Sequence, residues 1–268
     1  TGVRFSGTVP SEEAPAHALT GAANGPTLRY AWGPSDTWTG VGQWYERLAA
    51  ELPRNDSSVR QQALALVATF KEPRAKLEAL LGFARQQVRY VAVEVGVGGY
   101  LAAAPAETLA RRWGDCKAKA LLLIDLLRAA GIAAHPALIL SDAEGRVADF
   151  PSPDEFNHLI VAVEAAGVAA TSDATAQGLL FVDPTHPYAS PGWLPASVQD
   201  QDALVVRGDG SNIVRTPTTA AHERTELAVA LELGKDGSQA GRALLHLEGE
   251  VAAQLEEAAA HLPEDRLQ

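Results

Sequence analysis

The chain has 268 residues, and its 33 Asp and Glu against 22 Lys and Arg give a formal net charge of −11 at pH 7. The hydrophobic content of 47% is that of an ordinary globular protein, which excludes a disordered or fibrous chain. The acidic charge argues against a nucleic-acid partner or an anionic membrane surface, and no apolar run is long enough to span a bilayer. The single cysteine excludes an internal disulfide and a cysteine-built zinc site, but it leaves a cysteine nucleophile open.

The first part of the chain predicts strands and turns followed by helices. Residues 1–35 are punctuated by Gly, Pro and Ser and show no helical period. A stripe of apolar residues at helical spacing then begins with Val41, Trp44, Leu48 and Leu52. Apolar spacing of this kind predicts three helices, over residues 41–52, 57–70 and 73–88. We interpret residues 1–56 as an N-terminal flanking segment that holds the end of a β-rich domain plus one helix.

The middle of the chain predicts a buried helix followed by a sheet. Residues 118–130 are nearly continuous Ala, Leu and Ile, with Gly114-Asp115 as a cap before them and Gly131 after them. Three strand candidates follow, at 132–140, 156–164 and 179–183. This order is typical of an α+β fold in which an antiparallel sheet packs on the helix. We assign residues 57–190 to this core.

The last part of the chain changes in character after about residue 188, where Pro191, Gly192 and Pro195 interrupt the pattern. Residues 225–250 alternate between apolar and polar around a Gly-Lys-Asp-Gly sequence at 234–237, which predicts a β-hairpin. We interpret residues 191–268 as a linker and the start of a C-terminal β-rich domain.

Three residues carry a chemical signal when they are taken together. Cys116 lies at the start of the predicted buried helix, where free N–H groups favour a thiolate. His158 lies near the start of a hydrophobic strand, and Asp183 ends the next strand candidate. Each also has a purely structural interpretation. Cys116 can be a small core residue, His158 a hydrogen-bonded core histidine, and Asp183 a turn residue before Pro184. Their order along helix, strand and strand predicts a nucleophile, a base and a residue that orients the base.

The rest of such a site has weaker candidates. An acyl-transfer site needs hydrogen-bond donors for the developing oxyanion, and the backbone N–H of Cys116 is one by position. Tyr90 and Trp113 are candidates for the oxyanion site or the cleft wall, although both can equally be packed aromatic residues. Asp115 fits a helix cap better than a catalytic acid. Because His and carboxylate residues do not occur at metal-ligand spacing, we expect no metal, and the sequence indicates no cofactor.

The motifs around these residues resemble a known family. Trp113-Gly114-Asp115-Cys116-Lys117, Phe156-Asn157-His158 and Phe181-Val182-Asp183-Pro184-Thr185 resemble the core of bacterial transglutaminase-like proteins. The likeness is to the subfamily in which this core lies between two β-rich domains of uncharacterised function. It implies a papain-like fold with a catalytic triad of Cys116, His158 and Asp183. Ala118 departs from the pattern, since a typical member has a second acid there, and this puts a local salt bridge in doubt. The flanking domains look truncated, which indicates a central piece of a longer protein.

The resulting hypothesis is a cysteine-dependent acyl-transfer enzyme that acts on peptide or protein amides through a thioester. Hydrolysis is favoured over crosslinking, because crosslinking needs an amine-binding groove and no residue indicates one. The alternative is a catalytically inactive transglutaminase-like module with a binding or scaffolding role. The resemblance favours export to the periplasm or surface of a bacterium, while a cytoplasmic location and the oligomeric state stay open.

Overall fold

The computed structural model describes residues 5–8, 27–30, 35–92, 100, 102–141, 151–186, 189–219, 224–248, 251–252 and 255. Within residues 1–35, two short strands pair antiparallel, β1 (Phe5–Thr8) and β2 (Thr27–Tyr30), and most of the predicted strands and turns there lie outside the described residues.

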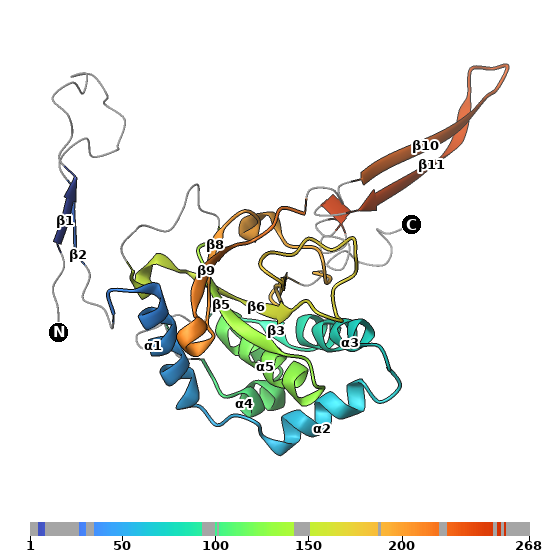
Figure 1. The fold of residues 1–268 in the computed structure, drawn as a ribbon. Coiled ribbons are helices and arrows are strands. Elements are labelled where there is room, and N and C mark those ends of the chain that lie inside the picture. Colours follow the sequence, from blue (N-terminus) through green and yellow to red (C-terminus); the bar gives the residue numbers. More distant parts are fainter. Residues whose placement is uncertain are drawn as a thin grey trace, which may run out of the picture.

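A five-stranded antiparallel sheet forms the centre of the molecule (Figure 1). Its strands lie in the order β7-β6-β5-β8-β9. Their bounds are Ala134–Ile139 (β5), His158–Glu164 (β6), Leu179–Val182 (β7), Asp202–Val205 (β8) and Asn212–Arg215 (β9). Side chains on both faces are buried: Leu159 and Val161 face the helices, whereas Ile160 packs in a second core with Leu194. Burial on both faces explains why these strands read as continuous apolar runs.

Helix α5 (Cys116–Ala129) packs against β5 and β6 and is surrounded by other helices. The Asp115 side chain caps it by accepting a hydrogen bond from the Ala118 N–H at 2.8 Å, as predicted. Gly131 follows with a φ of +82°, a left-handed conformation that suits glycine. This helix on an antiparallel sheet confirms the predicted α+β fold.

The remaining helices cover α5 and one end of the sheet (Figure 1). They are α1 (Trp38–Ala50), α2 (Ser57–Leu66), α3 (Pro73–Gln86) and the unpredicted α4 (Pro105–Arg111). Short 3₁₀ helices in the described part of the chain are η2 (Pro153–Glu155), η3 (Ala196–Val198) and η4 (Gly208–Gly210). Three of the four α-helices were predicted, with ends that differ by a few residues. In the described part of the chain, no helix has the length and hydrophobicity needed to cross a membrane.

The central sheet extends beyond residue 190, where the sequence interpretation placed the end of the core. Strand β8 pairs with β5, and β9 pairs with β8. Helix α1, from the predicted flanking segment 1–56, contacts β8, β9 and η4. Strands β8 and β9 have four residues each and mix polar with apolar side chains, so they show no clear period in the sequence. The domain boundaries themselves stay a prediction.

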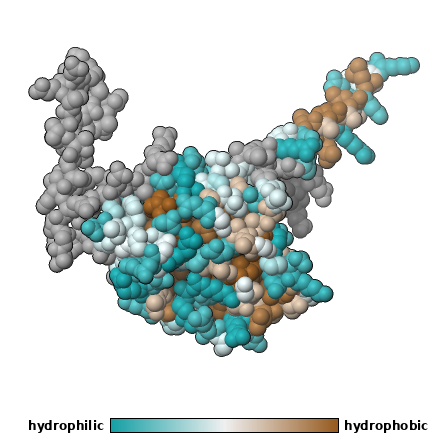
Figure 2. Space-filling view, viewed as in Figure 1, coloured by the Kyte–Doolittle hydropathy of each residue, from teal (hydrophilic) through white to brown (hydrophobic). Residues whose placement is uncertain are grey.

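The predicted C-terminal hairpin is confirmed as β10 (Arg224–Leu233) and β11 (Gln239–Glu248), which project from the body of the molecule (Figure 1). Its side chains are largely exposed, and Figure 2 shows apolar residues along this arm. Leu227, Val229, Leu231 and Leu233 alternate along β10 and therefore share one face.

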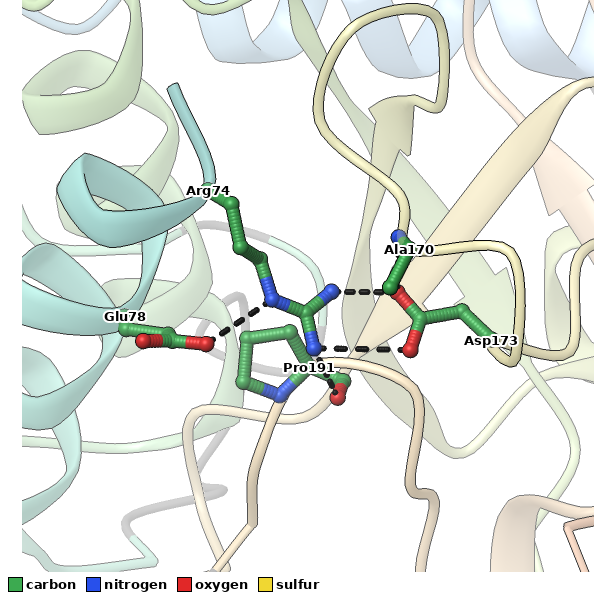
Figure 3. Close-up of polar contacts among 5 residues, drawn as sticks. All are labelled: Arg74, Glu78, Ala170, Asp173 and Pro191. Carbon is green, nitrogen blue, oxygen red and sulfur yellow. Dashed lines mark hydrogen bonds and ion pairs between the residues drawn. The ribbon is translucent and has the colours of Figure 1, made fainter. Parts of the chain in front are cut away.

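An ion-pair network ties helix α3 to two loops at the edge of the sheet (Figure 3). The Arg74 guanidinium bonds Glu78 on its own helix, Asp173 in the loop between β6 and β7, and the Pro191 carbonyl at 2.9 Å. Gly192 has a φ of +86°, and a Cβ there would come within 2.3 Å of Asp173 Oδ1. This close approach requires glycine and holds the loop before β7 in place.

Candidate active site

Cys116 is the first residue of α5 and is 2% exposed. It follows a short strand, β4 (Trp113–Gly114), which pairs in parallel with β3 (Arg89–Tyr90). Gly114 lies so close to α5 that a Cβ would come within 2.8 Å of the Ala118 Cβ. A small residue at each of these positions lets the strand lead directly into the helix. The thiol is thereby held at the helix N-terminus, where the dipole favours negative charge.

His158 and Asp183 come from neighbouring strands. His158 is the first residue of β6, and Asp183 directly follows β7. The His158 Nε2 lies 2.9 Å from Asp183 Oδ2. The other carboxylate oxygen, Oδ1, accepts bonds from the Thr185 N–H at 2.8 Å and from the Thr185 hydroxyl at 2.6 Å. Because both oxygens are engaged, the carboxylate has a fixed orientation toward the ring.

The side chain of Cys116 also lies close enough to the His158 imidazole to affect its pKa, and both residues line one cavity. The structure thus brings together the three residues that the sequence selected. Burial alone lowers the pKa of His158, but the Asp183 carboxylate and the Cys116 sulfur outweigh it and raise this pKa to about 10. Burial raises the pKa of Asp183, yet its bonds to His158 and Thr185 hold the pKa below the usual value. The ring is therefore protonated at neutral pH, and the Asp183 carboxylate and the Cys116 sulfur both favour its positive charge.

Two lysines on α5 lie near this group. Lys117 Nζ pairs with Asp115 Oδ2 at 3.0 Å and lies 4.0 Å from the Cys116 sulfur. Lys119 is 1% exposed, and its Nζ donates to the Val88 carbonyl at 2.5 Å. Burial lowers the pKa of Lys119 to about 8, against the opposing effect of Asp183. Both lysines add positive charge on the side of the helix where a thiolate and a carboxylate would lie.

A cavity of about 300 Å³ opens beside the thiol. Cys116 and His158 line it, together with apolar side chains that include Leu138, Phe156 and Leu159. Its wall also holds residues that the sequence reasoning missed, among them Tyr45 and Tyr100. The site therefore combines a buried thiol, a neighbouring imidazole and a partly open cavity with both polar and apolar walls, which suits covalent catalysis on an acyl group.

Residues 60–169 match the model of the transglutaminase-like superfamily. This segment is a transglutaminase-like core. The match includes Cys116 and His158 but ends before Asp183, which the fold supplies from the strand next to β6. It also begins after Tyr45, so part of the cavity wall comes from outside the matched segment.

Two solved structures match the chain. A candidate protease from Parabacteroides distasonis ATCC 8503 is 13% identical, with a TM-score of 0.54, and the match covers 88% of this chain and 48% of that one. A candidate cysteine protease from Cytophaga hutchinsonii is 16% identical, with a TM-score of 0.35, and the match covers 71% and 48%. No curated protein matches the chain in sequence. The chain spans about half the length of both structures, and the first supports the fold of the transglutaminase-like core.

The two aromatic candidates from the sequence lie beside the transglutaminase-like site. Tyr90 is 44% exposed on β3, and Trp113 on β4 carries the Arg111 guanidinium over its ring at 3.9 Å. Among the described residues, neither of them lines the cavity. Their role in the oxyanion site or cleft wall stays a prediction.

The histidines at positions 135 and 186 have separate surroundings. His135 Nε2 lies 3.1 Å from Glu164 Oε1, and His186 packs edge-on against Trp193 at 5.1 Å between ring centroids. Within the described ranges, no group of three or more His, Cys, Asp or Glu side chains could hold a metal ion.

Proposed function

We propose that this chain is a cysteine-dependent acyl-transfer enzyme that hydrolyses peptide or protein amides. In this proposal Cys116 is the nucleophile, His158 is the acid and base, and Asp183 orients His158. The observation that supports it is the position of the His158 ring, which bonds Asp183 and lines the same cavity as Cys116. Such a relay is what an activated nucleophile requires.

The proposed reaction has two halves. The thiol proton resides on His158, and the thiolate sulfur attacks the carbonyl carbon of the amide. His158 then gives this proton to the leaving amine as the C–N bond breaks, and a thioester on Cys116 remains. Water attacks the thioester carbonyl, His158 accepts a proton from it, and the acid leaves as the C–S bond breaks. Asp183 keeps the ring in one orientation and balances its positive charge throughout.

The partly open cavity supports hydrolysis over crosslinking. Its wall has room for an acyl side chain, and water can reach the thioester once the amine has left. The sequence has no residue that indicates an amine-binding groove, which crosslinking would need. The comparison with a candidate protease supports the same direction by fold alone.

The first test uses the single cysteine of the chain, because alkylation by iodoacetamide then reports one site. A thiol without assistance has a pKa of about 8.5 and alkylates slowly at pH 6. Since His158 is protonated at neutral pH beside the sulfur, we expect fast alkylation of the native chain already at pH 6. His158→Ala should slow alkylation at pH 6 by about 10²-fold, because the thiolate loses its counter-ion. Mass spectrometry gives both rates.

Two controls make this test decisive. The urea-denatured chain supplies the rate of the unassisted thiol, and Cys116→Ala supplies the background of amide hydrolysis on a peptide library. A native rate that follows the denatured rate across pH, and is unchanged by His158→Ala, would contradict the proposal. It would favour the alternative of a transglutaminase-like binding module.

A further inference from the structure

Each polar side chain on the cavity wall, apart from one, is engaged with another group. The Asn157 amide accepts from the Ser141 N–H at 2.8 Å and donates to the Ser141 carbonyl at 3.2 Å. The Tyr100 hydroxyl donates to Asp154. These side chains therefore already have hydrogen-bond partners within the protein before a substrate enters.

The remaining ionisable groups on the wall are committed as well. His158 bonds Asp183, and the Lys117 ammonium pairs with Asp115. Tyr45 is the exception, because its hydroxyl makes no hydrogen bond to another described residue. Because Tyr45 lines the cavity, its hydroxyl can donate a hydrogen bond to a group that enters there.

Tyr45 reaches the cavity from α1 and is 2% exposed. Val41, one turn earlier, is fully buried, and Trp44 packs edge-on against the Tyr100 ring at 5.4 Å between centroids. The helix therefore holds the Tyr45 ring firmly against the site. Burial, followed by the negative charges expected at Cys116 and Asp115, raises the pKa of Tyr45. The phenol keeps its proton and can act as a donor at every pH at which the enzyme works.

We propose that the Tyr45 hydroxyl donates a hydrogen bond to the carbonyl oxygen of the substrate while Cys116 attacks the carbonyl carbon. This role rests on the proposed acyl-transfer function and makes Tyr45 a catalytic residue of it. The first donor is the Cys116 N–H, which belongs to the first turn of α5, where N–H groups have no partner within the helix. The Tyr45 hydroxyl is the second.

The step is balanced without an additional reactant. The Cys116 sulfur forms a bond to the carbonyl carbon, and the C=O electron pair moves to oxygen. The resulting oxyanion accepts hydrogen bonds from the Cys116 N–H and the Tyr45 O–H, and Tyr45 keeps its proton. When the C=O bond re-forms, the leaving group departs with the electron pair of its bond to carbon. Tyr45 therefore stabilises negative charge that exists only during acyl transfer.

The test compares two reactions of the same thiol. Iodoacetamide alkylates Cys116 by displacement at a CH₂ group, and no oxyanion forms. p-Nitrophenyl acetate acylates Cys116 through an oxyanion, and the burst of p-nitrophenolate gives the rate. Tyr45→Phe removes only the hydroxyl. We expect it to slow the burst by about 10²-fold, the usual effect of losing one such donor, while alkylation stays within about twofold of wild type.

Tyr100→Phe is the matched control, since it removes another tyrosine hydroxyl from the same wall, one that already serves Asp154. We expect both of its rates to stay near those of wild type. A burst that Tyr45→Phe leaves unchanged would overturn the role of Tyr45 alone. Equal losses of burst and alkylation in Tyr45→Phe would also overturn it, because they would indicate that Tyr45 only supports the position of the thiol. Absence of a burst from the wild-type chain would overturn the proposed function together with this role.

Discussion

Two histidine–carboxylate pairs among the described residues lie on adjacent strands, and they differ in a way that their distances do not show. His158 lies 2.9 Å from Asp183 at one end of β6, and His135 lies 3.1 Å from Glu164 at the other end. The His158 pKa is raised to about 10, whereas the His135 pKa is lowered. Pairing with a carboxylate is therefore not what distinguishes the candidate site.

The surroundings of the carboxylate account for part of the difference. The Asp183 side chain is 4% exposed, but that of Glu164 is 41% exposed and lies 3.6 Å from Arg207. Solvent and a neighbouring guanidinium weaken the effect of Glu164 on its histidine. Burial of the ring is the largest effect on His135 and lowers its pKa, and Arg207 lowers it further.

The second part of the difference is the sulfur. Cys116 raises the pKa of His158 in addition to Asp183, so two side chains favour the protonated ring. His135 has the Arg128 guanidinium nearby, which lowers its pKa. His158 is the candidate acid and base because a buried carboxylate and a thiol both lie next to its ring.

The largest expected effect comes from removing one carboxylate of each pair. Asp183→Asn keeps the shape of the side chain but lets the His158 ring take the wrong tautomer, so we expect kcat/KM for p-nitrophenyl acetate to fall by about 10⁴-fold. The matched change, Glu164→Gln, alters a half-exposed pair. We expect its kcat/KM to stay within about twofold of wild type, because an ordinary surface substitution has a small effect. Comparable losses in the two variants would show that the pairs do not differ in the way proposed.

The two rings should also titrate on opposite sides of the ordinary histidine value. We expect the His158 ring to stay protonated at pH 8 and to titrate near pH 10, and the His135 ring to titrate below 6.5. Nitrogen-15 NMR of the imidazoles, assigned with His158→Gln and His135→Gln, measures both. Alkylation of Cys116 removes the sulfur charge and should lower the His158 pKa, while His135 should not respond. A His158 ring that titrates at 6.5 before alkylation would contradict the comparison.

The sequence could predict much of this arrangement because its parts are long or chemically distinct. Helix α5 and strands β5 to β7 are nearly continuous apolar runs, which arise from burial on both faces. Cys116, His158 and Asp183 followed from their residue types and their order along those elements. Strand β7 is equally short but entirely apolar, whereas β8 and β9 mix polar and apolar residues in a way that does not separate them from loops.

Tyr45 could not be selected in the same way, because its role depends on where α1 packs. The apolar stripe was drawn through Val41 and Trp44, whereas the structure fully buries Val41 and Tyr45 and leaves Trp44 partly covered. The spacing of four between Val41 and Tyr45 was the available signal, since i and i+4 share a helix face. It indicates burial but not the cavity that the hydroxyl meets.

The smallest expected effect concerns the acid stability of the His135 pair. A lowered pKa in the folded state means that the unfolded chain binds more protons at this ring, so the ring reduces stability as the pH falls through about 6.5. His135→Gln removes this proton uptake, and the variant should lose less stability than wild type between pH 7 and pH 5. Urea midpoints at the two pH values give the comparison, and burst kinetics at pH 7 should stay within about twofold of wild type. A variant that is more sensitive to acid than wild type would mean that the Glu164 charge dominates over burial at His135. The two pairs would then differ in the thiol alone.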